Sequence, residues 1–91
     1  MADLMDRLLA EADGCQTWSN GPGDVYGEHH HAYDKILYCV AGSIVFTVPG
    51  GEVRLGPGDR LELAAGTAHG AVVGPNGCTC IEGRGGKMAP R

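Results

Sequence analysis

Glycine and proline divide most of this chain into short segments, and this punctuation limits the folds open to it more than any other feature. From Cys15 onward, short β-forming runs such as ILYCV and SIVFTV alternate with turn sequences such as PGG, GPG and GPNG. Glycine supplies the positive φ that tight turns need, and proline is excluded from central strands because it lacks an N–H donor. The pattern is typical of an all-β sandwich or small barrel and predicts a barrel domain over residues 15–83.

The segments on either side of this barrel follow other patterns. Within residues 1–14, apolar side chains recur at the spacing of one helix face and Gly14 follows as a stop, so we expect a short amphipathic helix. These apolar residues are Leu4, Met5, Leu8, Leu9 and Ala12. Residues 84–91 have no apolar periodicity, and we expect them to form a flexible tail.

Charge and hydropathy exclude several classes of function. The formal net charge is -4, and Lys and Arg are scattered rather than gathered in a stripe that could neutralise phosphates, so we expect no nucleic-acid partner. No apolar run approaches the roughly 18 residues of a membrane helix. The N-terminus carries acidic residues where a signal peptide would be basic, which predicts a cytoplasmic protein with reduced cysteines.

Three consecutive histidines, residues 29–31, lie in the sequence GEHHHAYDK, and His69 is the only other histidine. The run is internal, which disfavours a purification tag. On a strand, His29 and His31 would point to one side and His30 to the other, toward solvent or an interface. Two imidazoles at this spacing can chelate one ion, although a polar barrel lining without an ion is the alternative.

These histidines also lie in two spaced motifs that resemble those of the cupin superfamily. The first motif is matched by Gly23, His29, His31 and Gly42, with Lys35 where the family has a glutamate. The second is matched by Gly58, Gly66 and His69, with Ala64 and Val73 in place of the family's proline and asparagine. The resemblance covers about residues 20–82.

The resemblance implies a jelly-roll β-barrel that holds a divalent metal ion through His29, His31 and His69. Three histidine ligands that leave coordination positions of the metal open suit zinc and are compatible with iron, nickel, copper or manganese. Lys35 replaces the family's fourth ligand, and a protonated ammonium has no lone pair to offer a cation.

Four further residues are predicted by strand parity to lie on the histidine face, namely Tyr33, Lys35, Leu37 and Cys39. Lys35 could hold an anionic ligand beside the metal, or it could form an ion pair, for which Glu62 is one candidate partner. Tyr33 could line the pocket or bind a ligand through its hydroxyl group.

The opposite face of the same strand is apolar, which requires a cover. Ile36, Tyr38 and Val40 lie there by strand parity, and either the N-terminal helix or a second subunit could bury them. Because a chain of 91 residues has a small core, and because of the cupin resemblance, we expect a homodimer.

Two functions from different classes follow. The first is a metal-dependent protein that binds a small anionic metabolite or, as an enzyme, acts on it. The second is a ligand-binding or sensor module without catalysis and with no ion or only an adventitious one. Fold resemblance alone does not select a reaction.

Overall fold

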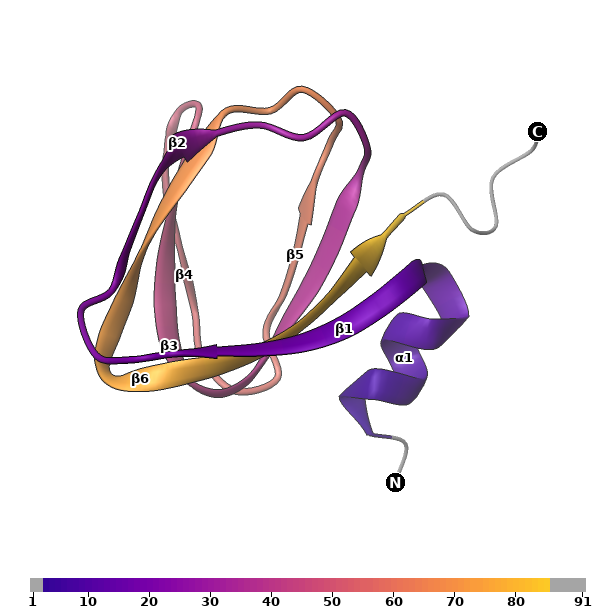
Figure 1. Ribbon diagram of the computed structural model, residues 1–91, viewed down its shortest axis with the longest axis horizontal. Coiled ribbons are helices and arrows are strands. Elements are labelled where there is room, and N and C mark those ends of the chain that lie inside the picture. The colour runs from indigo at the N-terminus through magenta and orange to yellow at the C-terminus, as the bar shows by residue number, and fades with distance from the viewer. Residues whose placement is uncertain (1–2, 86–91) are drawn as a thin grey trace.

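The computed structural model describes residues 3–85, and it confirms an all-β barrel with one short N-terminal helix (Figure 1). The elements are α1 (Leu4–Glu11), β1 (Asp13–Asn20), β2 (Val25–His29), β3 (Lys35–Val48), β4 (Gly51–Leu55), β5 (Arg60–Leu63) and β6 (His69–Arg84). Within the described part of the chain, no helix is long and apolar enough to cross a membrane.

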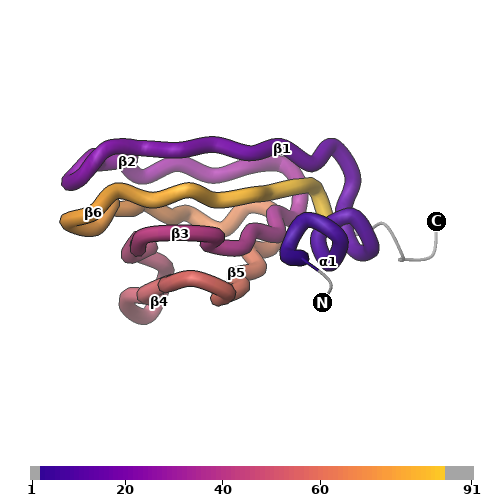
Figure 2. Tube along the Cα trace, turned by 90° about the horizontal axis from the view of Figure 1, so that it is seen from below, coloured from indigo at the N-terminus to yellow at the C-terminus, as the bar shows by residue number. Residues whose placement is uncertain are grey.

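The strands form one six-stranded antiparallel sheet that is organised around its two longest members. β6 pairs with β3 along most of its length, with β2 near its start and with β1 near its end. β3 pairs with β5 near its start and with β4 near its end. Seen from the side, β1 and β2 lie over β3, β4 and β5, with β6 running between these two layers (Figure 2).

Two apolar clusters lie on the two faces of this curved sheet. The inner cluster fills the barrel and contains Leu37, Cys39, Ile44, Phe46, Leu55, Ala71, Val73, Cys78 and Cys80. The outer cluster contains Leu8, Ala12, Ile36, Tyr38 and Ile81, with Leu4, Met5 and Cys15 packed against it. The predicted alternation along β3 is therefore confirmed, since Leu37 and Cys39 face inward whereas Ile36 and Tyr38 face outward.

α1 covers two of the three outward residues of β3, Ile36 and Tyr38. Its N-terminus is capped by Asp3, whose side chain accepts a hydrogen bond of 2.8 Å from the Asp6 backbone N–H. The helix ends at Glu11, before the predicted stop at Gly14. The helix ends early because pairing with β6 already draws the chain into a strand at Asp13. Gly14 has a φ of 64° and lies where the register between β1 and β6 shifts.

The histidine run departs from the continuous strand that the sequence predicts. β2 ends at His29 and β3 begins at Lys35, so residues 30–34 form a connection. At the other end of the barrel domain, β6 continues to Arg84, one residue into the predicted tail. Residues 86–91 of that tail lie outside the described residues.

Candidate metal centre

His29 and His69 come together through the pairing of β2 with β6. They are direct partners in the antiparallel register, at the last residue of β2 and the first residue of β6. Directly opposed residues in such a pair have neighbouring side chains on one face. The register therefore places two imidazoles that are distant in sequence side by side.

His31 reaches the same place from the connection rather than from a strand. Its carbonyl oxygen accepts a hydrogen bond of 2.8 Å from the Gly66 N–H. The side chain of Asp34 accepts another of 2.8 Å from the Ala65 N–H. These two bonds tie residues 31–34 to the turn before His69, so the two histidine segments are held against each other.

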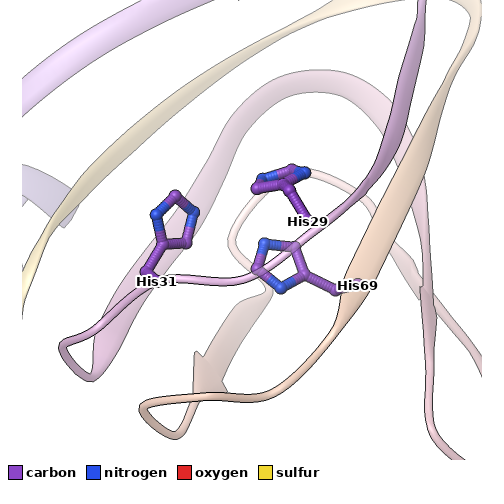
Figure 3. A group of neighbouring side chains, drawn as sticks. All are labelled: His29, His31 and His69. Carbon is purple, nitrogen blue, oxygen red and sulfur yellow. The ribbon is translucent and has the colours of Figure 1, made fainter.

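The three rings form one cluster (Figure 3). The ring centroids of His29 and His69 are 4.4 Å apart, and that of His31 lies 5.0 Å from His29 and 5.3 Å from His69. One nitrogen from each ring can be chosen so that all three lie within 4.8 Å of one another. Three nitrogens around one zinc ion lie about 3 to 4 Å apart, so small inward ring rotations would close the set.

Backbone carbonyls select the nitrogen that two of the rings, those of His29 and His69, can offer. Nδ1 of His29 lies 2.8 Å from the Gly27 carbonyl oxygen, and Nδ1 of His69 lies 2.9 Å from the Thr67 carbonyl oxygen. A carbonyl only accepts, so each Nδ1 donates its proton and the Nε2 lone pair is left free. Histidines that bind metals are commonly oriented in this way.

Two of the ring nitrogens are buried without a partner. Among the described residues, Nε2 of His31 and Nε2 of His69 are the buried side-chain nitrogen or oxygen atoms that make no hydrogen bond. Such atoms normally have a partner, because desolvation of an unpaired polar group is unfavourable. A donor set of three imidazoles with two unpaired buried nitrogens fits a transition metal ion.

The surroundings favour the neutral form of the His31 and His69 imidazoles, which is the form that binds metals. Burial lowers the pKa of His31, and the positive charge of Lys35 lowers it further. Burial also lowers the pKa of His69, although the hydrogen bond to Thr67 opposes the shift. Both rings therefore keep a lone pair available at neutral pH.

A cavity of about 270 Å³ adjoins the cluster. Aromatic and aliphatic side chains form much of its wall, and polar groups lie among them. The lining consists of Gln16, Trp18, Tyr26, His29, Lys35, Phe46, His69, Ala71 and Glu82. A small organic molecule can therefore lie against the histidines.

Lys35 lines this cavity, as the sequence predicts, but its partner there is Glu82 rather than Glu62. Its Nζ lies 3.3 Å from a carboxylate oxygen of Glu82, and both side chains are almost buried. Glu62 instead pairs with Arg60. The prediction of Glu62 was wrong because Glu62 is the register partner of Ile36, which faces outward, whereas Glu82 of β6 shares the cavity with Lys35.

The remaining predicted residues lie at the margin of the site. The Tyr33 ring lies 5.1 Å from the His31 ring, with the Arg84 guanidinium 4.6 Å from its centre. It lines a neighbouring cavity together with Glu82 and Arg84. His30 is exposed.

Six of the nine residues that line this cavity were not predicted to lie there, namely Gln16, Trp18, Tyr26, Phe46, Ala71 and Glu82. A signal for Glu82 exists, since it follows Cys78 and Cys80 at a spacing of two and so shares their inward face. Trp18 Nε1 donates a hydrogen bond of 2.7 Å to Glu82. That bond depends on the pairing of β1 with β6 and has no local signal.

The family model described as "Cupin domain" matches residues 17–84. The chain is 40% identical over 53 residues to quercetin 2,3-dioxygenase of Bacillus subtilis, a match that covers 56% of this chain and 16% of that protein. It is 43% identical over 49 residues to the tetracenomycin polyketide synthase protein TcmJ of Streptomyces glaucescens, covering 53% of this chain and 33% of that protein. The chain thus spans a third or less of the length of either relative.

Solved structures share the fold over most of the chain. KdgF from Halomonas sp. is 29% identical with a TM-score of 0.66, over 77% of this chain and 66% of that one. DMSP lyase DddQ from Ruegeria pomeroyi has a TM-score of 0.73 at 23% identity, over 85% of this chain and 40% of that one. A cupin superfamily protein from Desulfitobacterium hafniense matches at 16% identity and a TM-score of 0.69, over 92% and 88% of the two chains. The last two similarities show the fold alone.

Proposed function

Because this chain belongs to the cupin family, we propose that it binds a divalent transition metal ion through His29, His31 and His69 and holds a small ligand with an anionic oxygen against that ion. The observation that carries the proposal is the state of the Nε2 atoms. Those of His31 and His69 are buried and unpaired, and the Nδ1 atoms of His29 and His69 are engaged by carbonyl oxygens.

A bound ion would act as a Lewis acid toward an oxygen-bearing ligand. The chain's own residues would do the rest. Trp18, Tyr26 and Phe46 would offer a flat apolar body aromatic surfaces to pack against. The Lys35 ammonium has three N–H donors. One is directed at Glu82, and the other two can bind a ligand oxygen.

We further propose that the protein catalyses a reaction of this ligand. Quercetin 2,3-dioxygenase is one of the relatives, and on this basis we propose oxygenation of a hydroxylated aromatic compound as the reaction to test first.

A second candidate function is a binding or sensing module without catalysis. The Lys35–Glu82 pair favours it, because these two charged side chains of the cavity wall already neutralise each other. A general acid or base needs a group that is free to exchange a proton with the ligand.

The test begins with elemental analysis of untagged protein, followed by X-ray absorption spectroscopy of the metal found. We expect about one ion per chain, with imidazole ligands at about 2.0 to 2.1 Å. The proposal is contradicted if the purified protein contains no metal and binds none when metal is added. Oxygen uptake with quercetin then separates the two candidates, since only the enzyme consumes dioxygen.

A further inference from the structure

Glu82 is the carboxylate of the histidine cavity and is held there from three sides. It lies on β6 between Gln16 of β1 and Leu37 of β3. One carboxylate oxygen accepts from Trp18 Nε1 at 2.7 Å and lies 3.3 Å from Lys35 Nζ. The other accepts from the Gln16 side-chain amide at 3.5 Å.

The pair formed by Lys35 and Glu82 is largely shielded from water. Their side chains are 11% and 12% exposed. Charges in such a setting act over longer distances than charges in water, because the effective dielectric constant is lower. An ammonium left alone on this wall would repel any cation at the histidines, and the carboxylate cancels that repulsion.

Both charges are felt at the imidazoles. Lys35 lowers the pKa values of His31 and His69, whereas Glu82 raises them. The two effects have opposite signs, as expected for a neutral pair seen from a nearby group. They support the geometric argument, which rests on the shared cavity and the short contacts.

We infer that Glu82 determines the charge specificity of this pocket. By neutralising Lys35, it allows the three histidines to accept a divalent cation although a lysine lies beside them. The inference rests on the proposed metal site and adds to it a residue that lies outside the histidine motifs. Trp18 and Gln16 keep the carboxylate directed at Lys35.

The test measures Co²⁺ affinity in the parent protein and in three variants, namely Glu82→Gln, Lys35→Met and the double variant. Trp18 is the only tryptophan and lies in the cavity wall, so quenching of its fluorescence by Co²⁺ reports binding directly. Glu82→Gln should weaken Co²⁺ binding on the order of tenfold, and Lys35→Met should strengthen it on the order of tenfold. The double variant, which is again neutral, should return to the parent affinity.

Glu62→Gln is the matched control, since Glu62 also pairs with a cation but lies outside the cavity on β5. It should leave Co²⁺ affinity unchanged. Equal affinities for Glu82→Gln and Glu62→Gln would overturn the inference while leaving the metal site intact. Absence of Co²⁺ binding in the parent would overturn the proposed function and the inference together.

Circular dichroism shows whether each variant is folded. If Glu82→Gln does not fold, Lys35→Met and the double variant still decide the question. The inference requires tighter binding in Lys35→Met and a return to the parent value in the double variant. Unchanged affinity in Lys35→Met would refute it.

Discussion

At the scale of single residues, neighbours of one type have different roles. His30 and His31 are adjacent, but His30 is exposed whereas Nε2 of His31 is buried and unpaired beside two other imidazoles. The hydrogen bond from Gly66 to the His31 carbonyl oxygen fixes this difference. Residue type alone therefore does not identify the candidate ligand.

His31→Ala and His30→Ala separate these roles. His31→Ala should lower metal affinity by more than about 100-fold, because loss of an outer-shell partner alone costs 10–100-fold. His30→Ala should bind as the parent does. Both are measured by metal content after dialysis and by Co²⁺ titration, and equal losses in the two variants would contradict the assignment of His31.

Two glycines with the same backbone conformation provide a second comparison at this scale. Gly42 and Gly23 both have a φ of 74°. A Cβ at Gly42 would lie 2.0 Å from the Gly77 carbonyl oxygen, whereas a Cβ at Gly23 would meet nothing within 4 Å. The two positions therefore share a conformational requirement but differ in space.

We expect Gly23→Ala to lower the free energy of unfolding by about 1 to 2 kcal/mol, the cost of a left-handed alanine. Gly42→Ala should lower it by more than about 4 kcal/mol, because backbone of β3 and β6 must also move apart. Urea denaturation measures both. Similar losses would show that the strands separate more easily than their close contact suggests.

At the scale of elements, α1 is part of the barrel's packing rather than an appendage. Leu8 is fully buried and lies in the outer cluster with Ile36 and Tyr38. Leu8→Ala should therefore lower the free energy of unfolding by about 2 to 5 kcal/mol. Leu9→Ala is the matched control on the same helix, and its loss should be smaller because Leu9 is 47% exposed. Equal losses in urea denaturation would contradict this packing role.

The end of α1 is also tied to the sheet by charge. Glu11 accepts hydrogen bonds from Arg60 on β5, at 2.7 Å for the shorter one, and from the Tyr38 hydroxyl on β3. The Arg60 bonds hold the pKa of Glu11 below its ordinary value of 4.5, although burial opposes the shift. The ionised carboxylate therefore stabilises the fold.

Because the folded-state pKa is lowered, this contribution is complete above pH 4.5 and is lost as the pH falls through the lowered value. The parent should be more stable than Glu11→Gln at neutral pH, and the difference should shrink below pH 4.5. Thermal melting at a series of pH values measures it. A difference that stays constant to pH 3 would show that the charge of Glu11 does not stabilise the fold.

At the scale of the whole molecule, the predicted homodimer remains a prediction. Of the three apolar residues in the outward row of β3, α1 covers Ile36 and Tyr38. Val40 remains 41% exposed. We expect a dimer in sedimentation at micromolar concentration that Val40→Glu converts to a monomer, while Val25→Glu, 70% exposed on β2, leaves it intact. A parent that sediments as a monomer contradicts the prediction.

The sequence by itself determined the fold class, the alternation along β3 and the candidate ligand residues. These features depend on interactions between close neighbours in the chain: turns need glycine at set positions, and side chains alternate along a strand. The histidines at 29, 31 and 69 could be singled out because each lies in a short motif with fixed spacing.

Only the tertiary structure decided what surrounds those histidines. Lys35 meets Glu82 because β3 pairs with β6, and Trp18 joins them because β1 pairs with β6 on the other side. The sequence likewise did not decide whether a helix or a second subunit covers Ile36 and Tyr38, and in the structure α1 packs there. Contacts of this kind depend on strand register and helix docking, which arise from the packing of the whole chain and leave no pattern among adjacent residues.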